Sequence, residues 1–186
     1  IAAASDSKMY DGTALTNPDF TYTDGILAEG DELTAVVEGT ITNYGTAANK
    51  VTSYKVIRGG QDVTAWYTFG ESVDGTLEIT KRSVTLTSAT AEKTYDGTAL
   101  TNATVELSGD GFVSGEGYTT EVTGSQTEVG ESPNEFTYTL NEGTLAENYE
   151  ITVVKGTLKV TKNVTEIVIA AASDSKMYDG TALTNP

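Results

Sequence analysis

Residues 8–17 read KMYDGTALTN, and this stretch decides how the remaining sequence is interpreted. The pattern returns as KTYDGTALTN at residues 93–102 and as KMYDGTALTN at residues 176–185. The first and third copies belong to a longer identity, because residues 1–18 and 169–186 are the same eighteen residues. A pattern that recurs about every 84 residues is typical of a tandem array in which each repeat is one structural unit.

The repeats divide the chain into three expected segments. Residues 1–83 form a first β repeat module, residues 84–166 a second, and residues 167–186 the first strand and turn of a truncated third. A module of this length can bury one modest core. The joint at residues 79–86 reads ITKRSVTL and contains no Gly or Pro. Because flexible linkers are rich in Gly and Ser, we expect stiff joints and modules that follow one another end to end.

Strand-like alternation is common in both modules, whereas helical periodicity is hard to find. Residues 136–140 (FTYTL) and 149–153 (YEITV) place apolar side chains at every second position. The 19 glycines and several Asp-Gly pairs supply turns between such runs. The predicted fold is all-β, with two tandem small antiparallel β-sandwich modules of immunoglobulin-like type. A helix-poor β-grasp-like module is the alternative.

The patterns also predict particular pairings and turns. Residues 149–154 are expected to form a hairpin with residues 157–161 across Lys155-Gly156. The side chains expected to face inward there are Tyr149, Ile151, Val153, Leu158 and Val160. In the first module, Tyr67 and Phe69 are expected to face Leu77 and Ile79. Tight turns are expected at Asp11-Gly12, Asp24-Gly25, Asp74-Gly75, Asp96-Gly97 and Asp110-Gly111.

Composition limits the chemistry that the chain can carry. The absence of Cys and His excludes disulfides, thiol chemistry and His-based catalysis. Twenty-seven acidic residues against eleven basic ones give a net charge of −16, which repels nucleic acids and anionic membranes. No apolar run approaches the roughly 20 residues that span a bilayer, so no membrane insertion is expected of this segment. We expect no enzyme activity and no cofactor.

The repeated Tyr-Asp-Gly triplet is interpreted as a structural turn. Gly accepts a positive φ and Asp accepts hydrogen bonds from nearby backbone N–H groups, while the Tyr is expected to anchor the turn on the core. These turn residues are Tyr10, Asp11, Gly12, Tyr95, Asp96, Gly97, Tyr178, Asp179 and Gly180.

Acidic loops and the single tryptophan are the remaining candidates for binding. The acidic loop residues Asp24, Glu29, Asp31, Glu32, Asp110 and Glu116 lack the close ligand spacing of a calcium loop, so solvated charge is the preferred interpretation. Residues 27–31 (LAEGD) line up with residues 112–116 (FVSGE) between the two modules. Alternation places Trp66 outward, where it could contact a ligand or a neighbouring module.

The Lys-x-Tyr-Asp-Gly-Thr-Ala-Leu-Thr string resembles the hallmark of YDG-type, or MBG (mostly-beta, glycine-rich), repeats of bacterial surface adhesins. Residues 148–162 (NYEITVVKGTLKVTK) are also similar to that family. The resemblance covers both modules and the C-terminal segment, although Trp66-Tyr67 stands where the second module has Asn148-Tyr149. It implies display outside the cell on the surface of a Gram-positive bacterium, anchored to the cell wall, with no catalytic residues. No metal-binding residues are expected, because the close ligand spacing of a calcium loop is absent.

The expected function is that of a structural stalk or spacer that projects a distal binding domain. The alternative is an adhesin repeat that contacts a host glycan or protein through multivalent modules. The chain is expected to be a monomer whose partners are neighbouring repeats. Because residues 169–186 are identical to residues 1–18, strand exchange between chains is a further expectation. We also expect this tail to be partly ordered against the second module.

Overall fold

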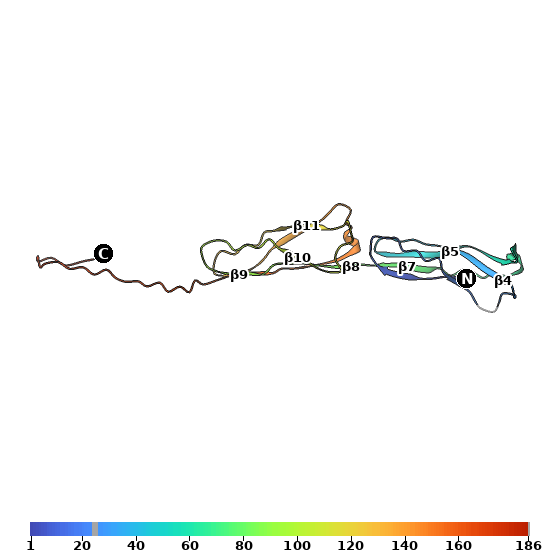
Figure 1. Ribbon diagram of the computed structural model, residues 1–186, viewed down its shortest axis with the longest axis horizontal. Coiled ribbons are helices and arrows are strands. Elements are labelled where there is room, and N and C mark those ends of the chain that lie inside the picture. The colour runs from blue at the N-terminus through green and yellow to red at the C-terminus, as the bar shows by residue number, and fades with distance from the viewer. Residues whose placement is uncertain (24–25, 186) are drawn as a thin grey trace.

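A computed structural model describes residues 1–23 and 26–185 and confirms that the fold is all-β (Figure 1). The strands are β1 (Ala2–Ala3), β2 (Asp6–Met9), β3 (Phe20–Thr21), β4 (Asp31–Glu38), β5 (Gly45–Arg58), β6 (Gln61–Asp62), β7 (Gly75–Thr80), β8 (Arg82–Ser88), β9 (Ala91–Thr94), β10 (Val105–Gly109), β11 (Tyr118–Val122), β12 (Gly130–Pro133), β13 (Phe136–Leu140), β14 (Tyr149–Val154) and β15 (Thr157–Thr161). Within the described ranges, the helical segments are two three-residue 3₁₀ turns, η1 (Thr64–Trp66) and η2 (Ala146–Asn148). The expected turn at Asp24-Gly25 lies outside the described residues.

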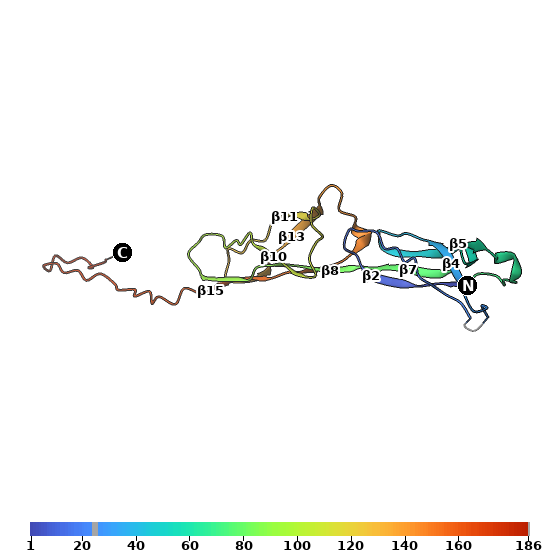
Figure 2. The ribbon, with the colours of Figure 1, turned by 45° about the vertical axis from the view of Figure 1, so that its right-hand side comes forward.

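Strand pairing falls into two groups, which we call the N-terminal unit (residues 1–80) and the C-terminal unit (residues 82–161). In the first, β2-β7-β5-β4 form one sheet and β1 pairs with β3. In the second, the sheets are β10-β8-β14, β12-β15-β9 and β11-β13. Only Lys81 separates β7 from β8, and the two units lie end to end in an elongated molecule (Figures 1 and 2).

The three larger sheets are mixed rather than purely antiparallel, because strands near the start of each unit pair in parallel with strands near its end, whereas β1-β3 and β11-β13 are antiparallel pairs. β2 runs parallel to β7, β8 runs parallel to β14, and β9 runs parallel to β15. The predicted hairpin between residues 149–154 and 157–161 is therefore wrong. β14 and β15 form consecutive parts of one extended segment, which follows β8 and then β9 in the same direction.

Gly156 is a crossing point and not a turn. A Cβ at this position would lie 2.3 Å from the Ser88 carbonyl oxygen, so only Gly allows the last strand to cross the first this closely. Gly75 has the same role in the N-terminal unit, where a Cβ would lie 2.2 Å from the Ala4 carbonyl oxygen. The predicted turn at Asp74-Gly75 is also wrong, since Gly75 begins β7. Glycine signals close backbone approach as well as turns, and the sequence does not distinguish the two.

The apolar core is continuous through the contact between the units. One cluster combines residues from both units: Tyr10, Leu15, Leu77, Ile79, Val84, Leu86, Phe136 and Tyr149. A smaller cluster of Leu33, Val56 and Val63 lies in the N-terminal unit, and Tyr67 and Phe69 pack against it. The expected packing of Tyr67 and Phe69 on Leu77 and Ile79 is therefore wrong. Of the five side chains expected inward in the second unit, Tyr149, Leu158 and Val160 are buried and Ile151 packs on the core, but Val153 is exposed.

A buried asparagine fastens the start of each unit to its interior. Asn134 is fully buried, and its Nδ2 donates to the carbonyl oxygens of Ala89 and Asn102, both at 2.9 Å. Asn49 does the same for Ala4 and Asn17 at 2.9 and 2.8 Å. Each amide fixes the chain where it passes from β1 to β2 or from β8 to β9, together with the loop that follows the Tyr-Asp-Gly turn.

The tail does not pack on the C-terminal unit, contrary to expectation. Residues 162–185 form no strand, are exposed, and extend away from the unit (Figures 1 and 2). In the N-terminal unit the identical residues 2–9 pair with Phe20–Thr21 and Gly75–Thr80, and the tail contains no copy of either partner. No helix among the described residues is both long and apolar enough to cross a membrane.

Replacing Asn134 with Ala should destabilise the C-terminal unit by about 1–3 kcal/mol, because it leaves two buried carbonyls without donors. Urea denaturation of the whole chain measures this change. Asn163→Ala is the matched control, since this asparagine lies in the exposed tail, and its effect should stay within about 0.5 kcal/mol. Equal stability of the two variants would contradict the fastening role of Asn134.

Candidate functional site at the joint between the units

The Lys-x-Tyr-Asp-Gly-Thr turn has the same geometry in all three copies. The Asp11 carboxylate accepts a hydrogen bond from the Thr13 backbone N–H at 2.9 Å and pairs with the Lys8 ammonium at 2.8 Å. The corresponding ion pairs are Lys93–Asp96 at 2.7 Å and Lys176–Asp179 at 2.9 Å. Gly12, Gly97 and Gly180 have φ of +80°, +79° and +79°. The turn forms even in the extended tail, so its geometry comes from local interactions alone.

The surroundings of the motif tyrosine differ sharply between the copies. Tyr10 is only 4% exposed, whereas Tyr95 is 38% exposed and Tyr178 is 94% exposed. The reason is that Tyr10 packs against the C-terminal unit, while Tyr95 lies at the far end of that unit and Tyr178 lies in the tail. The expectation that the Tyr anchors its turn on the core therefore describes Tyr10, which is buried by the neighbouring unit.

Glu116 joins the two units through two tyrosine hydroxyls. The hydroxyl of Tyr10 donates to one of its carboxylate oxygens, and the hydroxyl of Tyr149 donates to the other at 2.6 Å. The Val113 backbone N–H donates to the Tyr149 hydroxyl at 3.2 Å. The rings of Tyr10 and Tyr149 meet edge to face with centroids 5.6 Å apart. A single carboxylate thus fixes the lateral position of both rings.

Asn148 makes a second polar contact across the joint. Its Oδ1 accepts the Tyr44 backbone N–H at 2.8 Å, and its Nδ2 donates to Asn43 Oδ1 at 3.2 Å. Asn148 is fully buried, so these bonds are shielded from water. On the connecting segment, the Lys81 ammonium lies 4.8 Å from the centroid of the Tyr44 ring, a cation–π contact.

Arg82 and Gly12 complete the contact. Arg82 donates to the carbonyl oxygens of Tyr10 at 3.3 Å and Gly111 at 2.8 Å, so it links the turn of one unit to a loop of the other. A Cβ on Gly12 would lie 3.0 Å from Cγ1 of Val113, whereas the equivalent Gly97 has nothing within 4 Å. Glycine is therefore needed at position 12 for two reasons: the backbone there has a positive φ, and the second unit approaches it closely.

The electrostatics of the joint favour neutral tyrosines beside a carboxylate. Burial raises the pKa of Tyr149 to about 12, and its hydrogen bond to Glu116 acts in the same direction. Burial and the hydrogen bond to Glu116 also raise the pKa of Tyr10. In the adjacent turn, the Lys8 ammonium and Thr13 lower the pKa of Asp11 to about 2.

Sequence reasoning missed the two residues on which the joint depends. Glu116 was interpreted as solvated loop charge, but it accepts both tyrosine hydroxyls. For Asn148, the sequence showed that Trp66 stands at the equivalent position of the first module, but no contact across the joint was predicted. The one signal that could have identified Glu116 is its alignment with Asp31, because both follow a Gly of positive φ and both accept a tyrosine hydroxyl. Asp31 is likewise not solvated, since its side chain is 0% exposed.

Trp66 lies at the end of the N-terminal unit that faces away from the joint. It is 68% exposed and belongs to η1, a 3₁₀ turn and not a strand. The guanidinium carbon of Arg58 lies 5.6 Å from the centroid of its ring. The structure therefore does not bring Trp66 together with the joint residues.

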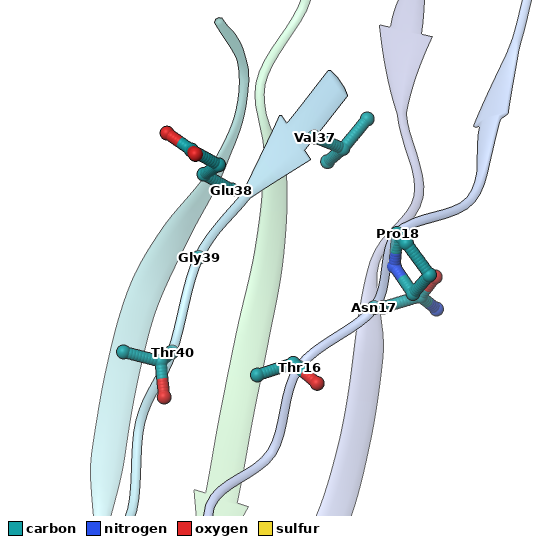
Figure 3. A pocket seen from close by; sticks show the side chains of 7 residues that line it. All are labelled: Thr16, Asn17, Pro18, Val37, Glu38, Gly39 and Thr40. Atoms are coloured by element: carbon teal, nitrogen blue, oxygen red, sulfur yellow. The ribbon is translucent and has the colours of Figure 1, made fainter. Parts of the chain in front are cut away.

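An open groove occurs at the same place in both units. In the N-terminal unit it runs between residues 16–18 and residues 37–40 (Figure 3), and in the C-terminal unit between residues 101–103 and 122–125. Thr16 and Thr40 are labelled on its two sides, and Glu38 is the one ionisable residue of its lining. In the part of the chain that the structure describes, no three His, Cys, Asp or Glu side chains converge to hold a metal. Asp24, one of the acidic loop residues, lies outside the described residues.

Comparisons with protein-family models, curated proteins and solved structures find no match for this chain. The resemblance to YDG-type repeats therefore stays a prediction.

Alkaline pH should weaken the joint through Tyr149. Because its folded pKa is raised to about 12, the neutral phenol contributes stability that is fully present below about pH 10 and is lost as the pH rises through 12. The free energy of unfolding, measured against pH, should therefore fall more steeply for the wild type than for Tyr149→Phe. Tyr95→Phe should retain the wild-type slope. Identical slopes for all three proteins would contradict this role.

Proposed function

We propose that the chain is a stalk or spacer segment of a long bacterial surface protein, which holds a distal binding domain away from the cell. In this proposal the function is mechanical: the chain supplies length and resists bending. The localisation, outside the cell and anchored to the wall of a Gram-positive bacterium, rests on the resemblance to YDG-type repeats. The absence of Cys and the net charge of −16 are compatible with an exposed, non-adhering rod.

The observation that carries this proposal is the construction of the joint. Only Lys81 lies between β7 and β8, so the connection has little length in which to bend. Bending the chain there would separate Tyr10 from Glu116 and Asn148 from Tyr44. Hydrogen bonds to charged groups contribute about 1.5–3 kcal/mol each, and an aromatic pair adds about 0.5–1.5 kcal/mol. Contacts of this size resist thermal bending, which a spacer requires.

A second candidate function is an adhesin repeat that binds a host glycan or protein. The observation that favours it is the exposure of Trp66, because exposed aromatic rings are common contacts for sugars and proteins. The occurrence of the same groove in both units would supply the repeated sites that multivalent binding needs. Host glycans that quench or shift Trp66 fluorescence in the single chain would support this candidate.

Tyr10→Ala should turn the stiff joint into a hinge. The substitution removes a buried ring and a hydrogen bond at the joint, at a cost on the order of 3 kcal/mol. Small-angle X-ray scattering of the chain should show a shorter mean maximum dimension and a broader distribution of distances than the wild type. Tyr95→Ala is the matched control, because the same motif position is exposed at the other end of the C-terminal unit.

The wild-type chain and Tyr95→Ala should both scatter as straight rods. If the wild type already scatters as a broad mixture of bent shapes, the spacer proposal is wrong. If Tyr10→Ala remains a straight rod, Tyr10 does not maintain the stiffness.

A further inference from the structure

The free end of the N-terminal unit carries a second copy of the site that receives Tyr10 at the joint. There the Tyr67 hydroxyl donates to the Asp31 carboxylate, as Tyr149 does to Glu116. The Ala28 backbone N–H donates to the Tyr67 hydroxyl at 3.0 Å, which matches the 3.2 Å bond from Val113 to Tyr149. Both sites therefore hold a tyrosine hydroxyl against a carboxylate with the same pattern of hydrogen bonds.

This end of the N-terminal unit is hollowed beside Tyr67, the counterpart of Tyr149 at the joint. A pocket of about 250 Å³ lies beside Tyr67, and Ile1, Leu27 and Phe69 contribute apolar side chains to its wall. Trp66 lies next to it along the chain and is exposed. A tyrosine side chain has the size and the mixed apolar and polar character to enter such a site, as Tyr10 does at the joint.

The outer end of the C-terminal unit carries the inserting half of the same contact. Tyr95 follows β9 as Tyr10 follows β2, and its side chain is 38% exposed. The turn beside it is preformed by the Lys93–Asp96 ion pair. Gly97 has free space around it where Gly12 meets Val113. This end has the shape of the Tyr10 end without a neighbour packed against it.

Where the two receiving sites differ in sequence, the ends of the units that would insert into them differ as well. The bridge Leu15–Ile41 in the N-terminal unit corresponds to the bridge Leu100–Gln126 in the C-terminal unit. Counting along the chain from these bridges, Glu128 and Val129 occupy the positions of Asn43 and Tyr44. At the joint, Asn148 bonds to Asn43 and to the backbone of Tyr44. At the free end of the N-terminal unit, Trp66 takes the place of Asn148 and stacks with Arg58. At the free end of the C-terminal unit, Glu128 and Val129 take the places of Asn43 and Tyr44, the partners of Asn148. If these two ends were joined, the Trp66 ring would face Val129 and the Arg58 cation would face Glu128.

We propose that the Asp31–Tyr67 site binds the Tyr95 end of a second copy of this chain joined in tandem before it. Residues 169–186 repeat residues 1–18, so tandem joining continues the chain from Val168 into Ile1 and brings the two ends together. The inference rests on the spacer function proposed above and deepens it. Two kinds of joint alternate along the array, one closed by Asn148 and the other by Trp66.

Arg58 is a further difference that docking must accommodate. Its guanidinium pairs with the Asp31 oxygen equivalent to the one that Tyr10 contacts on Glu116. The Arg58 side chain is 43% exposed, and Glu128 is the acidic residue that docking would bring toward it. Because the Asp31 side chain is 0% exposed and its two oxygens are bonded by Arg58 and Tyr67, docking requires Arg58 to release its oxygen. In the docked joint that oxygen accepts the Tyr95 hydroxyl, as Glu116 accepts Tyr10.

The test uses a tandem chain of residues 1–168 followed by residues 1–186, in which one of the two copies of Trp66 is replaced so that a single tryptophan remains. In one protein Trp66→Phe is made in the first copy, so the remaining tryptophan lies at the new joint. In the matched control the substitution is made in the second copy, which leaves the tryptophan at the free end. We expect acrylamide quenching to fall several-fold at the new joint relative to the control, with a blue shift of the emission.

Further variants separate docking from general folding effects. Tyr95→Ala in the first copy should restore the quenching of the control, whereas Tyr10→Ala in the first copy should leave the new joint protected. Equal quenching of the two single-tryptophan proteins overturns the inference. If scattering still shows a straight 186-residue chain, the spacer function survives that failure. A tryptophan that is exposed at the new joint but protected by added host glycan also overturns the inference and favours the adhesin candidate.

Discussion

The sharing of the Glu116 carboxylate by Tyr10 and Tyr149 is the interaction on which the shape of the molecule depends. One tyrosine comes from each unit, and each hydroxyl binds a different oxygen of the same carboxylate. Moving either unit sideways would break at least one bond and leave a carboxylate oxygen without its donor. A hydrogen bond to a charged acceptor is costly to lose when its surroundings are partly buried. The apolar cluster around it extends into both units, so packing and polar contacts oppose the same motion.

The topology of each unit makes such a joint possible. The first and last strands lie side by side and run in parallel, so a unit receives the chain at one end and releases it at the other. The last strand of one unit then continues, after Lys81, as the first strand of the next. An antiparallel hairpin at the end of the unit would return the chain to the end from which it came. Gly75 and Gly156 permit this arrangement, because they let the last strand cross closely over the first.

The repeated motif therefore has one local and one long-range role. The Lys, Asp, Gly and Thr residues build the turn, which is present in all three copies whatever surrounds it. Tyr10 projects from its turn into the C-terminal unit and is 4% exposed, whereas Tyr95 and Tyr178, which have no such unit packed against them in the structure, are 38% and 94% exposed. Under the proposed spacer function, the motif would act as a connector that recurs once at each joint.

The sequence by itself determined the all-β class, the repeat spacing and the Asp-Gly turn, because these depend on alternation, identity and local backbone chemistry. Residues such as Asp11 and Gly12 carry their information within a few positions along the chain. Only the tertiary structure decided the parallel pairing of the first and last strands and the role of Gly156, because close approach of distant backbones leaves no local pattern. Glu116 and Asn148 escaped prediction for the same reason: each has a partner in the other unit, Tyr10 or Tyr44, that lies about a hundred residues away along the chain. A carboxylate in a loop looks solvated in sequence, and packing alone determines whether water or two tyrosines satisfy it.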